Sequence, residues 1–249
     1  MACVACTRAR ARSSRRPAIS ASSSSRSWRQ ASACAAESRE TDALAELGGE
    51  VPEGHREILQ AESEAEAIWI WEPQVVPGLI QTEDYTRSLL NRWGNLFARP
   101  AGEIERRAET KQLRQRILTR SEPPPPELSF VIDESVLFRA LASPRVMRNQ
   151  LAHLIEMSHS PNVDLRVLHL RSQQIIVTGA FNYFRFPQIH GVWRPDAVAF
   201  EHMLETTFTS SEIEVNSYKV AFSAVRGMSL SQEATRDILA KAAAETWVE

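Results

Sequence analysis

Hydrophobic and polar residues alternate along this chain in two spacings, which predict both helices and strands. Helical spacing or helix-start signals predict helices over 53–62, 83–93, 102–119 and 144–155, then from Ser210 or Ser211 to Gly227, and after Leu230. Short apolar or alternating runs predict strands over 68–71, 128–132, 163–168, 181–186 and 197–203. Because these elements do not follow a strict strand–helix alternation, we expect an α+β fold. Its sheet should be mixed or antiparallel, with about four to five short strands packed with helices.

The first forty residues differ from the rest of the chain in composition. They contain ten serines and eight arginines, but few large aliphatic residues besides Val4 and Ile19. Their net charge is +6, whereas the remaining 209 residues carry −8. Such a segment cannot bury enough apolar surface to offset the entropy lost on ordering. The sequence therefore predicts a disordered basic leader over 1–50, with a connector at its end, and a folded, acidic domain over 51–249.

Three interpretations of this leader stay open. Its arginine- and serine-rich composition is typical of an organelle transit peptide, and also of a basic arm that contacts nucleic acid. A third possibility is translation from a wrong frame or start codon. Cys3 and Cys6 have zinc-type spacing, but no second pair accompanies them, so no metal or cofactor is predicted. No apolar run approaches the ~20 residues of a membrane span. We expect a cytoplasmic protein without a membrane segment.

The segment from Trp71 to Tyr85 combines a strand end, a turn and a helix start. A strand-prone run ends before Pro73, since proline lacks a backbone donor. Pro77 and Gly78 predict a turn in which the glycine accepts a positive φ. Thr82 is a good N-cap for the helix that follows. Local propensities do not explain why Gln81 or Tyr85 occupies its position.

This segment, WEPQVVPGLIQTEDY, closely resembles a motif of actinobacterial XRE-type helix-turn-helix regulators of the WhiJ class. The motif belongs to their C-terminal domain, which has no assigned function. The resemblance covers about residues 52–242. It continues through RQRIL at 114–118, DESVL at 133–137, VMRNQL at 146–151, PNV at 161–163, GAF at 179–181, Glu201 and LSQE at 230–233.

The resemblance implies a regulatory role. Members of that class carry a helix-turn-helix of about sixty residues before the matched region, but residues 1–50 lack an amphipathic pattern and a candidate recognition helix. We therefore expect this module to be degenerate or lost, so DNA is a partner only if the intact gene product contains it. The resemblance further implies an antitoxin-like protein whose partner is a small BldB-like protein. A small-molecule ligand is a further possibility.

Aromatic, carboxylate and amide side chains at this junction and at matched positions are the candidate ligand- or partner-binding residues. They could line a pocket or hold the junction to the core. These residues are Trp71, Glu72, Pro77, Gly78, Gln81, Thr82, Tyr85, Arg114, Gln115 and Glu201.

Two other classes of function are alternatives. One is a small-molecule enzyme that uses Asp133, Glu134 and Glu201 for acid–base chemistry. The other is nucleic-acid binding through the basic leader. The chain has no HExxH, GxSxG or phosphate-loop motif. The preferred prediction is a non-enzymatic regulatory domain that senses a ligand or partner.

Overall fold

A computed structural model describes residues 53–97, 100–172, 179–188, 194–202 and 206–248. The predicted leader, residues 1–50, lies outside these residues, as do the cysteines and the three interpretations that concern it. Among the described residues, no helix is both long and apolar enough to cross a membrane.

Six strands form one mixed sheet in the order β3-β2-β1-β4-β5-β6. The first three strands, β1, β2 and β3, are parallel, and each later strand is antiparallel to its neighbour. The predicted α+β class with a mixed sheet is confirmed, with one strand more than the upper bound of the prediction. The strands are β1 (Ala67–Glu72), β2 (Glu127–Asp133), β3 (Val163–Leu168), β4 (Phe181–Arg185), β5 (Ala197–Glu201) and β6 (Thr206–Thr209).

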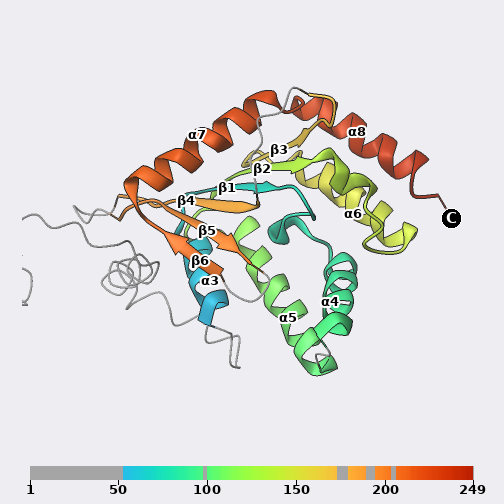
Figure 1. The fold of residues 1–249 in the computed structure, drawn as a ribbon, viewed down its shortest axis with the longest axis horizontal. Helices are drawn as coiled ribbons and strands as arrows, with labels where there is room; N and C mark the ends of the chain where they lie inside the picture. The colour runs from blue at the N-terminus through green and yellow to red at the C-terminus, as the bar shows by residue number, and fades with distance from the viewer. Residues whose placement is uncertain (1–52, 98–99, 173–178, 189–193, 203–205, 249) are drawn as a thin grey trace, which may run out of the picture.

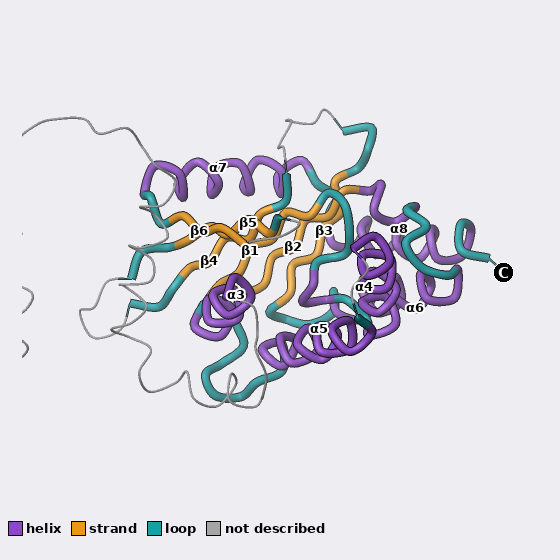
Figure 2. The backbone as a smooth tube through the Cα atoms, turned by 60° about the horizontal axis from the view of Figure 1, so that its bottom comes forward, coloured by secondary structure: helices purple, strands orange, loops and turns teal. Residues whose placement is uncertain are grey.

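Helices cover both faces of the sheet unequally. Figures 1 and 2 show α7 along one face, while α3, α4 and α5 lie on the other; α6 packs with α8 on that same side. The helices are α3 (Glu53–Glu64), α4 (Glu83–Phe97), α5 (Ala101–Arg114), α6 (Pro144–Met157), α7 (Glu212–Met228) and α8 (Gln232–Glu245). Three 3-10 turns accompany them: η2 (Gly78–Ile80), η3 (Gln115–Leu118) and η4 (Glu134–Phe138).

Alternation along the strands divides the core into two layers. On β1, Ile68 and Ile70 belong to the larger layer, whereas Trp69 and Trp71 face the layer under α7. Parallel strands need crossover connections, and α4, α5 and α6 supply them on the same face. The larger core therefore lies on the side of the crossover helices.

Helix α8 covers the open edge of β3. The backbone N–H of Val167 donates to the Thr235 hydroxyl at 3.1 Å, and its carbonyl accepts from Leu230 N–H at 2.9 Å. An edge strand with such groups uncovered is a template for aggregation. Side-chain and loop contacts thus end the sheet at β3.

Three local expectations are corrected. Strand β6 was missed because TTFT is short and carries one apolar residue. Gly227 does not close α7: the helix continues to Met228 and Ser229 is its C-cap. Gly78 has no positive φ, because it begins η2 rather than occupying a left-handed turn position.

The core packing predicts that alanine substitution of two neighbouring leucines changes the free energy of unfolding by different amounts. Leu165 on β3 is fully buried, whereas Leu170 is 54% exposed. We expect Leu165→Ala to lower the free energy of unfolding by about 2–5 kcal/mol, through lost burial and the cavity left behind. Leu170→Ala, the matched control, should change it by less than about 0.5 kcal/mol. Urea denaturation measures both, and equal effects would contradict this core assignment.

Candidate functional site

Side chains of the Trp71–Tyr85 segment hold the loop between β1 and α4. The backbone N–H of Val76 donates to the Tyr85 hydroxyl at 3.3 Å, and Gln81 Nε2 donates to the Val76 carbonyl at 2.6 Å. Both side chains are buried, and burial raises the pKa of Tyr85 to about 12. Thr82 Oγ1 accepts from Tyr85 N–H at 3.4 Å, as expected of an N-cap. Pro77 precedes η2 as its N-cap.

Two glutamines from other parts of the chain complete the attachment of this loop. Gln150 of α6 donates to the Ile80 carbonyl at 2.8 Å and accepts from Thr82 N–H at 2.7 Å. Gln115 donates to the carbonyls of Gln81 and, at 3.4 Å, Gly78. The loop polar groups are therefore satisfied by side-chain amides that lie far from it in sequence.

Trp71 does not join this group. It faces the opposite side of the sheet and packs in the layer under α7, where Phe181 is its partner on β4. The indole is 4% exposed, and its Nε1 has no hydrogen-bond partner among the described residues. Trp71 and Tyr85 thus contribute to different core layers.

A buried ion pair connects α3 to α5. Arg114 contacts Glu62 through two hydrogen bonds, Nε to Oε2 at 3.0 Å and Nη2 to Oε1 at 2.7 Å. The two residues are 5% and 2% exposed. The guanidinium also lies 3.8 Å from Glu201 Oε1 at the end of β5. It packs beside Gly78, where an added Cβ would lie 3.7 Å from Nη1.

The charge state of this pair follows from its surroundings. Burial raises the pKa of Glu62, and the charge and hydrogen bonds of Arg114 oppose that shift. Burial alone would lower the pKa of Arg114, but Glu62 and Glu201 outweigh it and the pKa is raised. The guanidinium is therefore charged, and its two-bond contact favours an ionised Glu62.

Glu72 and Lys111 extend the pair into a larger network. Burial, together with the charge of Glu201, raises the pKa of Glu72 to about 7, against hydrogen bonds from the loop backbone and the charge of Lys111. Lys111 Nζ donates to Gln81 Oε1 at 3.2 Å, and burial together with Arg114 lowers its pKa to about 8. Both groups titrate near neutral pH, which is a property of functional sites more often than of surfaces.

We call Glu62, Glu72, Lys111, Arg114 and Glu201 the ion network. Strands β1 and β5 run in the same direction, since β4 is antiparallel to both. Glu72 and Glu201, the last residues of these strands, therefore lie at the same end of the sheet. The Glu201 side chain is 44% exposed, whereas Glu62 is buried. The network therefore runs from solvent at β5 to the interior contact with α3.

The carboxylates of the enzyme alternative do not meet. Asp133 Oδ1 accepts from Ser135 N–H at 2.9 Å and caps η4, and Glu134 Oε2 accepts from Leu170 N–H at 2.7 Å. Glu201 lies on β5, three strand spacings from β2, or about 14 Å at ~4.8 Å per spacing. Within the described residues, no group of three or more His, Cys, Asp or Glu could hold a metal ion.

The comparisons with known proteins give one match. The family model described as "Domain of unknown function (DUF5753)" matches residues 55–241, about three quarters of the chain. The chain belongs to the DUF5753 family. No curated protein and no solved structure matches it. All of the ion network and every candidate residue proposed from the sequence fall inside this DUF5753 domain.

The sequence found part of the DUF5753 ion network and missed part. Glu72, Arg114 and Glu201 were candidates, and the structure brings them together with Gln81, Gln115 and Gly78. The missed residues are Glu62 and Lys111 of the network, and Gln150, which holds the adjoining β1–α4 loop. Signals existed for two of them, since a polar residue interrupts an apolar helix stripe.

Lys111 lies three residues after Ala108 on the apolar side of α5. Gln150 lies four residues after Val146, on the apolar side of α6. Glu62 lies four residues after Ile58, but α3 is polar along most of its length, so this position does not stand out in the sequence.

The buried pair predicts strong non-additivity between two substitutions. Arg114→Met should lower the free energy of unfolding by about 3–5 kcal/mol, because Glu62 is left as an uncompensated buried charge. Adding Glu62→Gln should restore a large part of that loss. Arg107→Met removes a partly exposed pair with Glu103 and should cost less than about 1 kcal/mol. Urea denaturation of wild type, Arg114→Met, Glu62→Gln, the double variant and Arg107→Met tests this, and additive effects of the two single substitutions would contradict a coupled pair.

The raised pKa of Glu72 predicts a pH-dependent stability difference. The folded state favours the protonated carboxyl, so its contribution is present below about pH 4.5 and is lost as pH rises through about 7. Glu72→Gln removes this loss. Between pH 5 and 8, the free energy of unfolding of the variant should rise relative to that of wild type by on the order of 1 kcal/mol, after discounting for partial exposure. Urea denaturation at both pH values measures it. The exposed Glu109→Gln is the control; a parallel gain there would count against Glu72.

Proposed function

We propose that this DUF5753 domain is the sensing part of an antitoxin-like helix-turn-helix transcriptional regulator. The observation that carries the proposal is the ion network, which links the exposed carboxylate of Glu201 to Glu62 of α3. Helix α3 is the first described element and follows the N-terminal segment directly. In the regulators that this chain resembles, the DNA-binding module precedes the matched domain. The network therefore connects the solvent-accessible Glu201 to α3, the helix nearest in sequence to the place where those regulators carry their DNA-binding module.

Charge competition at Arg114 supplies the mechanism. Its guanidinium bonds to Glu62 and also lies 3.8 Å from Glu201. A cationic group that binds Glu201 would compete with Arg114 for that carboxylate. Arg114 would then interact with Glu62 only, which would strengthen the attachment of α3 to α5. The Glu62–Arg114 contact is buried, so these two charges interact more strongly than they would in water, whereas Glu201 is 44% exposed and open to a partner. Binding acts by favouring one of two α3 states over the other.

The composition supports a basic surface as the binding partner. Residues 41–249 carry a net charge of −8, and charge complementarity steers association. By resemblance, the partner is a small BldB-like protein; a small cationic molecule could occupy the same edge. DNA would be bound through a helix-turn-helix in the intact gene product, and the protein would act in the cytoplasm without enzymatic activity.

Hydrogen exchange on the full chain tests this proposal. The purified chain is mixed with a BldB-like protein encoded beside its gene, and complex formation is measured by calorimetry. In the complex, we expect amide exchange in residues 56–64 to slow by about tenfold, which corresponds to about 1.4 kcal/mol. Glu201→Gln should weaken both binding and this protection, whereas Glu233→Gln, an exposed substitution on α8, should leave both unchanged.

A second variant separates binding from transmission. Arg114→Met should retain the partner but lose the slowed exchange in α3, because the guanidinium that connects Glu201 to Glu62 is gone. Circular dichroism establishes that the variant is folded at the assay temperature. Absence of binding, or binding with unchanged exchange in α3, would overturn the sensing role of the network.

A further inference from the structure

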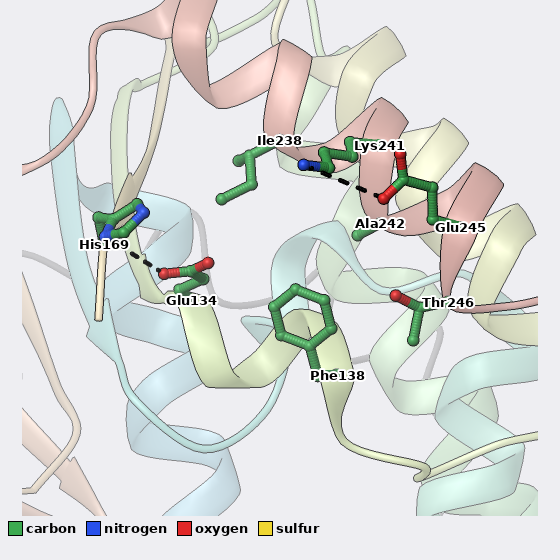
Figure 3. Close-up of a pocket in the computed structure, with 8 residues that line it drawn as sticks. All are labelled: Glu134, Phe138, His169, Ile238, Lys241, Ala242, Glu245 and Thr246. Carbon is green, nitrogen blue, oxygen red and sulfur yellow. Dashed lines mark ion pairs between the residues drawn. The ribbon is translucent and has the colours of Figure 1, made fainter. Parts of the chain in front are cut away.

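A cavity lies between η4 and α8, at the carboxyl ends of β2 and β3. It measures about 180 Å³ and is open to solvent on one side. Its apolar lining comes from Phe138, Ile238 and Ala242, and its polar lining comes from Glu134, His169, Lys241, Glu245 and Thr246. Figure 3 shows these side chains around a common space. Of these residues, only Glu134 was singled out from the sequence, as a candidate acid.

The walls of this cavity are fixed by hydrogen bonds outside it. Trp247 Nε1 donates to the Leu137 carbonyl at 2.8 Å, which attaches the end of α8 to η4. Arg148 Nη1 of α6 donates to the Trp247 carbonyl at 2.6 Å. A site with walls held in this way is largely formed before a ligand binds, which reduces the entropy cost of binding.

One end of the cavity is anionic. Glu134 is 9% exposed, and its Oε2 accepts from Leu170 N–H and lies 3.6 Å from His169 Nδ1. Figure 3 shows the other carboxylate oxygen turned toward the space between Ile238 and Phe138. A buried carboxylate facing a cavity favours a hydrogen-bonding cation.

The α8 wall carries a cation. The Lys241 ammonium forms a loose ion pair with Glu245 Oε2 at 4.0 Å, and the two side chains are 69% and 67% exposed, so Lys241 stands at the open rim of the cavity. In Figure 3 the lysine nitrogen lies on the α8 wall beside Ile238, across the cavity from Glu134, and a dashed line joins it to Glu245. The cavity therefore presents an acceptor at one end, a cationic donor on the facing wall and an apolar surface between them.

We propose that this cavity binds a small zwitterion of the aliphatic α-amino acid class. The ammonium of the ligand bonds to Glu134, its carboxylate contacts Lys241, and its aliphatic side chain packs on Phe138 and Ile238. A volume of 180 Å³ is below the ~300–1,000 Å³ of sites for drug-sized ligands, so only a compact molecule fits. Glu245 adds negative charge to the rim and disfavours a ligand with a second carboxylate.

This site is separate from the ion network and does not rest on the regulatory role proposed above. The network lies among α3, α5 and β5, whereas the cavity lies between η4 and α8. Amino-acid binding at the cavity and partner binding at Glu201 can therefore succeed or fail independently.

Titration of the full chain with L-leucine, followed by amide NMR, tests the proposal. We expect saturable shifts in residues of η4 and α8. Two analogues separate the contributions: isoamylamine lacks the carboxylate and 4-methylpentanoate lacks the ammonium. Each should bind about tenfold or more weakly than leucine, since each loses a charge-assisted contact. L-glutamate should also bind more weakly, because of Glu245.

Substitutions locate the site. Glu134→Gln keeps an acceptor for Leu170 N–H but removes the charge, and Lys241→Met keeps the length of the side chain. Each should weaken leucine binding about tenfold or more, while Lys219→Met on α7 should not. Amide spectra of the variants away from the cavity report their folding. The proposal is overturned if leucine causes no saturable shifts, if 4-methylpentanoate binds as tightly, or if neither cavity substitution weakens binding.

Discussion

The buried contact between Glu62 and Arg114 constrains how α3 and α5 pack in this domain. Removing two charges from water costs several kcal/mol per ion, and the cost is offset only when geometry supplies close, directed hydrogen bonds. Here two such bonds form between helices whose residues are 52 positions apart in sequence. Helix α5 must therefore lie against α3, and both must lie against the sheet edge that carries Glu201. The position of Gly78 beside the guanidinium extends the same constraint to the β1–α4 loop.

The β1–α4 loop shows how a segment without regular structure is made rigid. Several of its carbonyls and amides bond to side chains of Gln81, Gln115 and Gln150. Each glutamine presents both a donor and an acceptor on one planar group, which suits a loop with mixed unsatisfied groups. Because Lys111 bonds to Gln81, this rigid loop also positions one cation of the ion network.

The topology places several ionisable side chains at one end of the sheet, where four strands have their carboxyl ends. These strands are β1, β2, β3 and β5. The last residue of a strand or the one directly after it is polar in each case, namely Glu72, Glu134, His169 and Glu201. Carboxyl ends of parallel strands are where open sheets with crossover helices place their ligands. The spacing between strands then separates the ion network from the η4–α8 cavity. The same end of the sheet thus carries both the ion network and the η4–α8 cavity, which differ in their chemistry.

The sequence by itself determined the local structure of this protein. Apolar spacing located five of the six strands and the helices, and Thr82 caps its helix as predicted, since these features depend on neighbours within a few residues. Short β6 was missed because four residues of TTFT carry little periodic signal.

Tertiary structure alone decided which polar groups meet. Trp71 faces the layer under α7 because successive residues of β1 point to opposite faces of the sheet, whereas Tyr85 of α4 packs in the larger core on the other face. Glu62 was paired with Arg114, and Glu72 acquired a pKa of about 7, because burial and the surrounding charges depend on the whole packed domain. Local pattern fixes which face a residue takes, and only the assembled fold fixes what it meets there.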